Sequence, residues 1–140
     1  MQDILLFINH HLVLFTVFTI ILGILVILEF IKLKRGATRL TPARLIQLIN
    51  HHKAVVVDIR SLDAFKAGHI TSAISLPLNE LKNKMKTLEK FKSQPIVVVC
   101  ATGADSPKAA VLLTEQGIQA QILNGGIRAW REAEMPLVKG

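Results

Sequence analysis

Cysteine and aromatic side chains are scarce in this sequence. Among 140 residues there is a single cysteine, Cys100, a single tryptophan and no tyrosine. One cysteine excludes a disulfide within the chain and a metal site built from several cysteines of one chain. Cys100 is therefore either a small core residue or a reactive thiol, and its surroundings decide between the two.

Acidic residues are also in the minority. The chain has 10 Asp and Glu against 17 Lys and Arg, which gives a formal net charge of +7. A basic domain beside an anionic membrane surface needs no nucleic acid to explain its charge. No basic motif with interleaved aromatic residues accompanies the charge, so we expect no nucleic acid partner.

Charge is absent from one long segment near the N-terminus. Residues 12–28 read LVLFTVFTIILGILVIL, and extension to residue 31 gives a helix of about 30 Å, the thickness of a bilayer core. A cleaved signal peptide would have a basic N-terminal region and a small-x-small cleavage site, which are missing here. A soluble core helix is rarely apolar on every face. We predict a membrane anchor at residues 1–35, with its single span at about 12–31.

Basic residues follow this span and none precedes it; they are Lys32, Lys34, Arg35 and Arg39. The positive-inside rule therefore places the following domain, residues 38–140, in the cytoplasm. Membrane lipid is the partner expected of the N-terminal segment.

Short apolar strands are expected in the rest of the chain. The runs AVVV at 54–57 and IVVV at 96–99 are rich in β-branched residues, as is typical of buried parallel strands. Shorter strands are expected at 73–76 and 120–123.

Helix signals alternate with these strands. Thr41 and Ser106 each precede a proline, which is the pattern of a hydroxyl N-cap followed by proline at the first helical position. Short helices are expected after Ser61 and after the Gly125-Gly126 turn, and the lysine-rich stretch 78–91 predicts an amphipathic helix or a pair of turns. The alternation predicts an α/β fold with a mainly parallel sheet flanked by helices.

Cys100 lies where the 96–99 strand ends, and a loop of mostly small residues separates it from the helix signal at Ser106. Ligands of open parallel sheets bind outside the carboxyl ends of the strands. A loop of small residues lets backbone N–H groups point into one concavity, and the helix N-terminus adds partial positive charge. These features favour a reactive thiolate at Cys100. A cysteine simply packed at the end of VVVC is the alternative.

Five short sequence motifs within about residues 40–137 resemble the rhodanese-like (sulfurtransferase) domain family. In order, they are VVVDIR at 55–60, AGHI at 67–70, AISLP at 73–77, IVVVCATG at 96–103 and LNGGIRAW at 123–130. The resemblance implies that Cys100 is the catalytic cysteine, which accepts sulfane sulfur as a persulfide and passes it to a nucleophile. It implies no metal and no organic cofactor.

The resemblance also implies roles for the neighbouring residues. The loop that cradles the sulfur and the incoming anion corresponds to Ala101, Thr102, Gly103, Ala104 and Asp105. Asp58 and Arg60 support loops through hydrogen bonds and ion pairs, and His69 falls at a mainly structural position. Gly125 and Gly126 match the closing turn before the last helix.

One loop position departs from the family pattern. Active members read C-x-x-G-x-R-S; Gly103 and Ser106 agree with this pattern, but Asp105 stands where the arginine is expected. An anion in place of a cation within about 6 Å of the ligand disfavours anionic thiosulfate by up to several kcal/mol at an effective dielectric near ~20. We therefore expect weak use of thiosulfate, with Lys108 one helical turn away as a partial substitute.

Two functions remain open. The first is a sulfurtransferase or sulfane-sulfur carrier, with a small sulfur donor or a protein persulfide donor or acceptor as partner; Cys100 and Gly103 support it. The alternative is a non-catalytic binding or signalling module at the membrane, which Asp105 favours. A phosphatase of this fold would need an arginine at the position of Ser106, so that activity is not expected. The resemblance and the anchor-plus-domain layout indicate a prokaryotic inner membrane.

Overall fold

The chain divides into two units, Met1–Arg35 and Gly36–Gly140. The computed structural model describes every residue except Arg35, and every side chain outside residues 33–35. The sequence prediction was an anchor at 1–35 and a domain that starts at residue 38.

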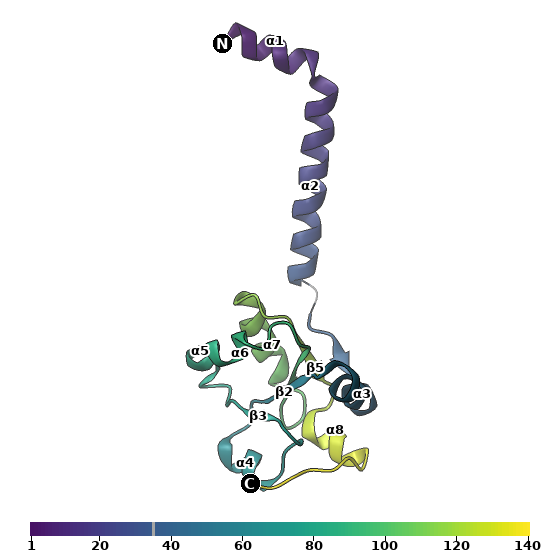
Figure 1. The fold of residues 1–140 in the computed structure, drawn as a ribbon, viewed down its shortest axis with the longest axis vertical. Coiled ribbons are helices and arrows are strands. Elements are labelled where there is room, and N and C mark those ends of the chain that lie inside the picture. Colours follow the sequence, from purple (N-terminus) through teal and green to yellow (C-terminus); the bar gives the residue numbers. More distant parts are fainter. Residues whose placement is uncertain (35) are drawn as a thin grey trace. The chain divides into compact units, whose positions relative to one another are not determined.

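The N-terminal unit consists of helices α1 (Gln2–His10) and α2 (Leu12–Lys34). Residues Leu12–Lys32 of α2 form a helix that is long and apolar enough to cross a membrane, and none of it is buried inside the unit. The separate helix α1 was not predicted. The helical backbone breaks at His11, with φ −113° and ψ 26°, so that α1 lies across the end of α2 instead of continuing it (Figure 1).

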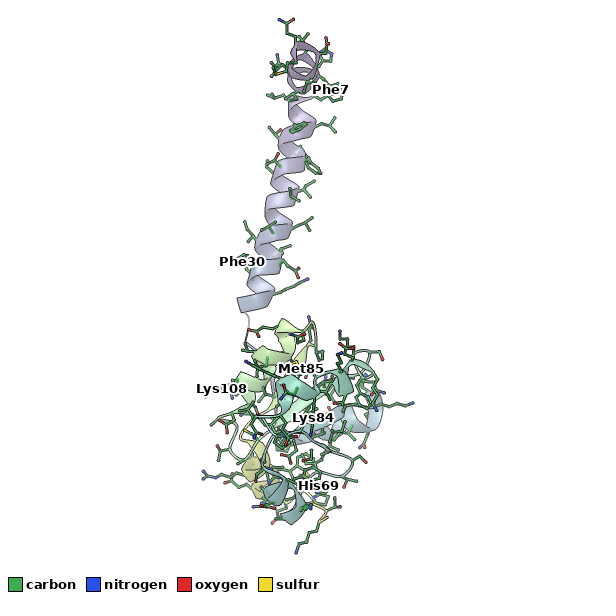
Figure 2. All side chains as sticks on the ribbon, turned by 90° about the vertical axis from the view of Figure 1, so that its left-hand side faces the viewer. Phe7, Phe30, His69, Lys84, Met85 and Lys108 are labelled. Atoms are coloured by element: carbon green, nitrogen blue, oxygen red, sulfur yellow. The ribbon has the colours of Figure 1, made fainter. Side chains whose placement is uncertain are left out.

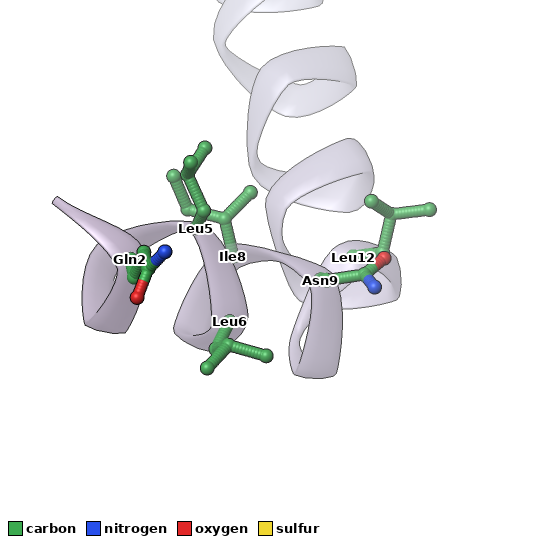
Figure 3. Close-up of a pocket in the computed structure, with 6 residues that line it drawn as sticks. All are labelled: Gln2, Leu5, Leu6, Ile8, Asn9 and Leu12. Atoms are coloured by element: carbon green, nitrogen blue, oxygen red, sulfur yellow. The ribbon is translucent and has the colours of Figure 1, made fainter.

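A groove lies between α1 and the start of α2 (Figure 3). It is lined by Gln2, Leu5, Leu6, Ile8, Asn9 and Leu12. Leu5 and Leu6 are about two-thirds exposed, so this unit leaves apolar side chains uncovered at its N-terminal end as well as along α2.

The second unit contains a five-stranded sheet in the order β1-β5-β4-β2-β3 (Figure 1). The strands are β1 (Arg39–Leu40), β2 (Val55–Asp58), β3 (Ile74–Ser75), β4 (Ile96–Val99) and β5 (Ala120–Leu123). Every strand pair is parallel. The predicted α/β fold with a parallel sheet is therefore confirmed. β4 is the middle strand and all of its residues are buried, which explains its continuous run of apolar β-branched residues.

Helices cover both faces of this sheet. They are α3 (Pro42–His52), α4 (Leu62–Ala67), α5 (Leu81–Lys84), α6 (Lys86–Glu89), α7 (Ser106–Glu115) and α8 (Gly126–Glu132). The predicted hydroxyl cap is present at Thr41, which accepts a hydrogen bond from the Arg44 amide. Ser61 also caps the helix that follows it, and accepts a hydrogen bond from the Ala64 amide. The lysine-rich stretch forms the short helices α5 and α6, in agreement with the pair of turns.

The predicted cap at Ser106 is wrong. Ser106 is the first residue of α7, and Asp105 takes the cap position without a side-chain hydrogen bond. A capping side chain requires an extended backbone, but Asp105 is already helical, with φ −92° and ψ −20°. The loop therefore runs directly into α7 and carries the Ser106 side chain into the interior, where none of its surface is exposed.

The alternation of side chains along β4 divides the core into two layers. Ile96, Val98 and Cys100 pack on one face with residues of α5, α6 and α7. Val97 and Val99 pack on the other face with residues of α3 and α8. Figure 1 shows these two groups of helices on opposite sides of the sheet. Cys100 consequently lies on the face that α7 covers.

Candidate active site

Cys100 directly follows β4, at the carboxyl end of the central strand. Only 2% of its surface is exposed. The strand alternation places its side chain in the same core layer as Ile96 and Val98. Its sulfur thus lies at the end of this core layer, beside the carboxyl ends of the strands, where parallel α/β folds bind ligands.

The loop after Cys100 turns back over the sulfur at Gly103. The backbone of Gly103 has φ +87°, a conformation that glycine adopts without the strain that other residues meet. In this conformation the Gly103 amide donates a hydrogen bond to Cys100 Sγ, with an N–S distance of 2.9 Å. The positive end of the N–H dipole therefore points at the sulfur, which suits a sulfur that carries negative charge.

The start of α8 binds the backbone of this loop through two hydrogen bonds. The Ile127 amide donates to the Cys100 carbonyl at 2.9 Å, and the Arg128 amide donates to the Ala101 carbonyl at 3.0 Å. Gly126 allows this approach: a Cβ atom there would lie 2.2 Å from the Cys100 carbonyl oxygen. The Gly125-Gly126 turn thus fixes the backbone that presents the sulfur.

Several loop amides are left free. In the part of the chain that the structure describes, no acceptor receives the N–H of Ala101, Thr102, Ala104, Asp105 or Ser106. The first four of these residues are exposed, whereas Gly103 and Cys100 are buried. Unpaired amides in a loop that joins a buried cysteine to the start of a helix favour the binding of anions and of sulfur lone pairs.

Asp58 and Arg60 form a buried ion pair. Arg60 Nη2 lies 2.7 Å from Asp58 Oδ2, and the two side chains are 9% and 1% exposed. Asp58 also accepts a hydrogen bond from the Arg60 amide, and Arg60 donates to the Gly68 carbonyl at 2.7 Å. Asp58 is in register with Val99 and so faces the layer opposite to Cys100. The pair ties the end of β2 to the end of α4, on the face of the sheet opposite to Cys100.

His69 is occupied by contacts within its own segment. Its Nδ1 lies 2.8 Å from the Phe65 carbonyl oxygen, and its ring stacks on Phe65 with centroids 3.8 Å apart. Its backbone pairs with Val138 near the C-terminus. Figure 2 labels His69 among the side chains of the domain. These contacts are those of a structural residue, in line with the sequence interpretation.

Asp105 ends the loop with an exposed carboxylate. In the described part of the chain neither Asp105 nor Lys108 takes part in an ion pair. Both side chains are exposed, and Lys108 is labelled in Figure 2. The loop therefore carries an uncompensated negative charge beside its free amides.

The buried hydroxyl of Ser106 was missed as a part of this site. Its Oγ atom has no hydrogen-bond partner in the described structure, and the residue is completely buried. The sequence contains a signal that could have identified it: positions 106, 109, 110 and 113 recur with the spacing of one helical face. A serine before a proline also has the pattern of an N-cap, and this pattern predicted a capping side chain instead of a buried one.

Comparisons with known proteins identify the family of this domain. The rhodanese-like domain family matches residues 41–133. The chain is 34% identical to the uncharacterized protein YibN of Escherichia coli, and that similarity covers 100% of this chain and 99% of YibN. It is 35% identical over 92 residues to the thiosulfate sulfurtransferase GlpE of Pseudoalteromonas translucida, which covers 65% of this chain and 86% of that protein.

A solved structure shares the fold. The crystal structure of a rhodanese-related protein from Thermoplasma volcanium superposes with a TM-score of 0.66 at 31% identity, over 72% of this chain and 97% of that chain. The family match covers strands β2 to β5, the Cys100 loop and the turn that supports it. The chain therefore belongs to the rhodanese-like domain family.

Proposed function

We propose that the protein is a sulfurtransferase or sulfane-sulfur carrier that holds sulfur as a persulfide on Cys100. The observation that carries this proposal is the geometry at the sulfur. Cys100 Sγ receives the Gly103 amide at 2.9 Å and lies at the base of a loop whose remaining amides have no acceptor in the described structure. A second sulfur atom on Cys100 would meet these free donors.

The chemistry needs only the thiolate and a donor. With a thiol persulfide R–S–SH, Cys100 Sγ attacks the outer sulfur, a new S–S bond forms, and the donor S–S bond breaks with its electron pair leaving on R–S⁻. An acceptor such as cyanide then attacks the outer sulfur, and the electron pair of the Cys100 S–S bond returns to Sγ. Transfer of neutral sulfur between nucleophiles balances without an external oxidant or reductant.

Asp105 determines which donors are favoured. Thiosulfate is a dianion, and the exposed Asp105 carboxylate repels it. Two arginines of the domain are already paired, Arg60 with Asp58 and Arg128 with Glu132. Lys108, three residues after Asp105, is in no ion pair of the described residues, and its exposed charge offsets that of Asp105 only in part. We infer that the site prefers a persulfide whose carrier is uncharged, cationic or a protein. The likeness to a protein named thiosulfate sulfurtransferase supports sulfur transfer as the reaction class.

We also infer that α2 attaches this domain to a membrane. Its span of 21 residues is apolar and has no cover within its own unit. The basic residues after the span favour the cytoplasmic side for the domain. Fractionation of cells into soluble and membrane parts, with extraction by alkaline carbonate, tests the attachment: the chain should stay with the membrane, and release by carbonate would contradict an integral anchor.

The alternative is a binding or signalling module without catalysis. The observation that favours it is the exposed, unpaired Asp105 on the loop. Such a module would have no need to load sulfur on Cys100, so one assay separates the two functions.

The test is sulfur loading of the full chain in detergent, followed by intact mass. Cysteamine persulfide, whose carrier is a cation, and thiosulfate are supplied separately, with Cys100→Ser as the control. We expect one sulfur atom to add to the wild-type chain from cysteamine persulfide, little from thiosulfate, and none to Cys100→Ser. A wild-type chain that takes up no sulfur from either donor supports the binding module instead.

A further inference from the structure

Ser106 places an unpaired hydroxyl inside the domain. The residue is 0% exposed, and Oγ has no hydrogen-bond partner among the described residues. Buried hydroxyls nearly always have a partner, because leaving one unpaired costs the hydrogen bonds that it made with water. A hydroxyl that is buried and unpaired is therefore a candidate donor to an atom that the thiol form lacks.

The position of Ser106 on α7 shows where the hydroxyl lies. The buried residues of this helix are Ser106, Ala109, Ala110 and Leu113. They share one helical face, and the last three pack in the core layer that also contains Cys100. Ser106 is the member of this stripe at the N-terminal end of α7, where the Cys100 loop enters the helix. Its hydroxyl therefore faces the core layer that contains Cys100, at the end of that layer where the Cys100 loop lies.

In the thiol form this hydroxyl does not bond to the sulfur. The hydrogen bond that the described structure gives Cys100 Sγ comes from Gly103. A persulfide would add a sulfur atom about 2 Å beyond Sγ. The loop amides and the Ser106 hydroxyl next to this part of the chain have no acceptor in the described structure.

We propose that the Ser106 hydroxyl is a binding group for the outer sulfur of the Cys100 persulfide and donates a hydrogen bond to it. This inference rests on the proposed persulfide chemistry and adds a side-chain donor to the backbone amides of the loop. The hydroxyl is unpaired in the thiol form and paired in the loaded form, so it favours loading. A hydrogen bond to a charged acceptor of this kind corresponds to a change of about tenfold or more in an equilibrium constant.

Ser75 provides a matched control. Its Oγ atom is also buried without a partner. Ser75 is in register with Asp58, which is in register with Val99, so its side chain faces the layer opposite to Cys100. Ser106→Ala and Ser75→Ala therefore remove the same kind of atom from two sites, of which only one lies in the layer of the sulfur.

The experiment measures the loading equilibrium of the full chain in detergent against cysteamine persulfide and free cysteamine, by intact mass. Ser106→Ala should lower the loading constant about tenfold, while Ser75→Ala and Ser106→Thr, which keeps a hydroxyl, should remain near wild type. The midpoint of thermal unfolding should not fall in the thiol form of Ser106→Ala, because no hydrogen bond is lost there. Loading should raise the midpoint of the wild type more than that of Ser106→Ala.

Two results would overturn the inference in distinguishable ways. If the wild type and Ser75→Ala load normally and Ser106→Ala loads equally well, the hydroxyl does not bind the outer sulfur, and the proposed function stands. If the wild type does not load at all, the proposed function and this inference fail together. If Ser106→Ala does not fold, the wild type alone still tests the inference. A midpoint of thermal unfolding that does not rise on loading would argue against a newly paired donor.

Discussion

The Gly125-Gly126 turn sets the position of the Cys100 loop, and Gly126→Ala tests this most sharply. A Cβ atom at position 126 would lie 2.2 Å from the Cys100 carbonyl oxygen and 2.9 Å from the carbonyl carbon of Ala101. These are backbone atoms, so no side-chain rotation relieves the overlap. The loop must move away from α8, and the hydrogen bonds from the amides of Ile127 and Arg128 are lost or weakened.

The magnitude follows from these contacts. Two backbone hydrogen bonds contribute about 1 kcal/mol each, and a non-glycine residue in the left-handed region costs about 1–2 kcal/mol. We therefore expect Gly126→Ala to lower the free energy of unfolding by roughly 3–4 kcal/mol. Gly117 is the control, since it also has positive φ, at +75°, but a Cβ there meets nothing within 4 Å. Gly117→Ala should cost only about 1–2 kcal/mol.

Trp130 supplies the assay. It is the only tryptophan of the chain, and it belongs to α8, where it is 3% exposed and packs in the core. Its fluorescence during urea unfolding therefore reports on the rhodanese-like domain even when the full chain is held in detergent. The rate at which an alkylating reagent modifies Cys100 in the folded protein should change in Gly126→Ala but not in Gly117→Ala. Equal destabilisation by the two substitutions, with unchanged alkylation, would refute the role given to the close approach.

The remaining predictions concern charge. Asp105→Arg should raise loading from thiosulfate by about tenfold or more and lower loading from cysteamine persulfide, because it reverses the charge beside the free loop amides. Asp105→Asn should give loading between that of the wild type and that of Asp105→Arg. An identical donor preference in all three chains would show that the loop charge does not select the donor. Arg60→Ala should lower the free energy of unfolding by about 3–5 kcal/mol in urea titrations, because it leaves the Asp58 carboxylate buried without its partner. A loss below about 1 kcal/mol, the value of an exposed pair, would mean that water reaches Asp58.

Most elements of the fold could be predicted because their signals are local. The runs of β-branched residues predicted β2 and β4 to within a residue, and the threonine-proline pair marked the start of α3. β1 could not be predicted in this way. It has two residues, and it is a strand only because Arg39 and Leu40 pair with Ile122 and Leu123 of β5, far along the chain.

Part of the site could likewise be predicted from local signals, and the rest depends on the tertiary fold. The order of strand, cysteine and small-residue loop placed Cys100 at the edge of the sheet. The loop is also supported by hydrogen bonds from the amides of Ile127 and Arg128, which come close to it only in the folded domain. The inward turn of Ser106 depends on the helical backbone of Asp105, and a serine-proline pair is equally compatible with a cap.

A single-turnover transfer experiment decides whether Cys100 carries sulfur and passes it on. The full chain is loaded from cysteamine persulfide, freed of excess donor and treated with cyanide, and thiocyanate is measured together with the intact mass. We predict one thiocyanate for each sulfur lost from the wild-type chain, return of Cys100 to the thiol, and no thiocyanate from Cys100→Ser. Sulfur that stays on the wild-type chain, or thiocyanate that forms equally from Cys100→Ser, would show that Cys100 does not transfer sulfur.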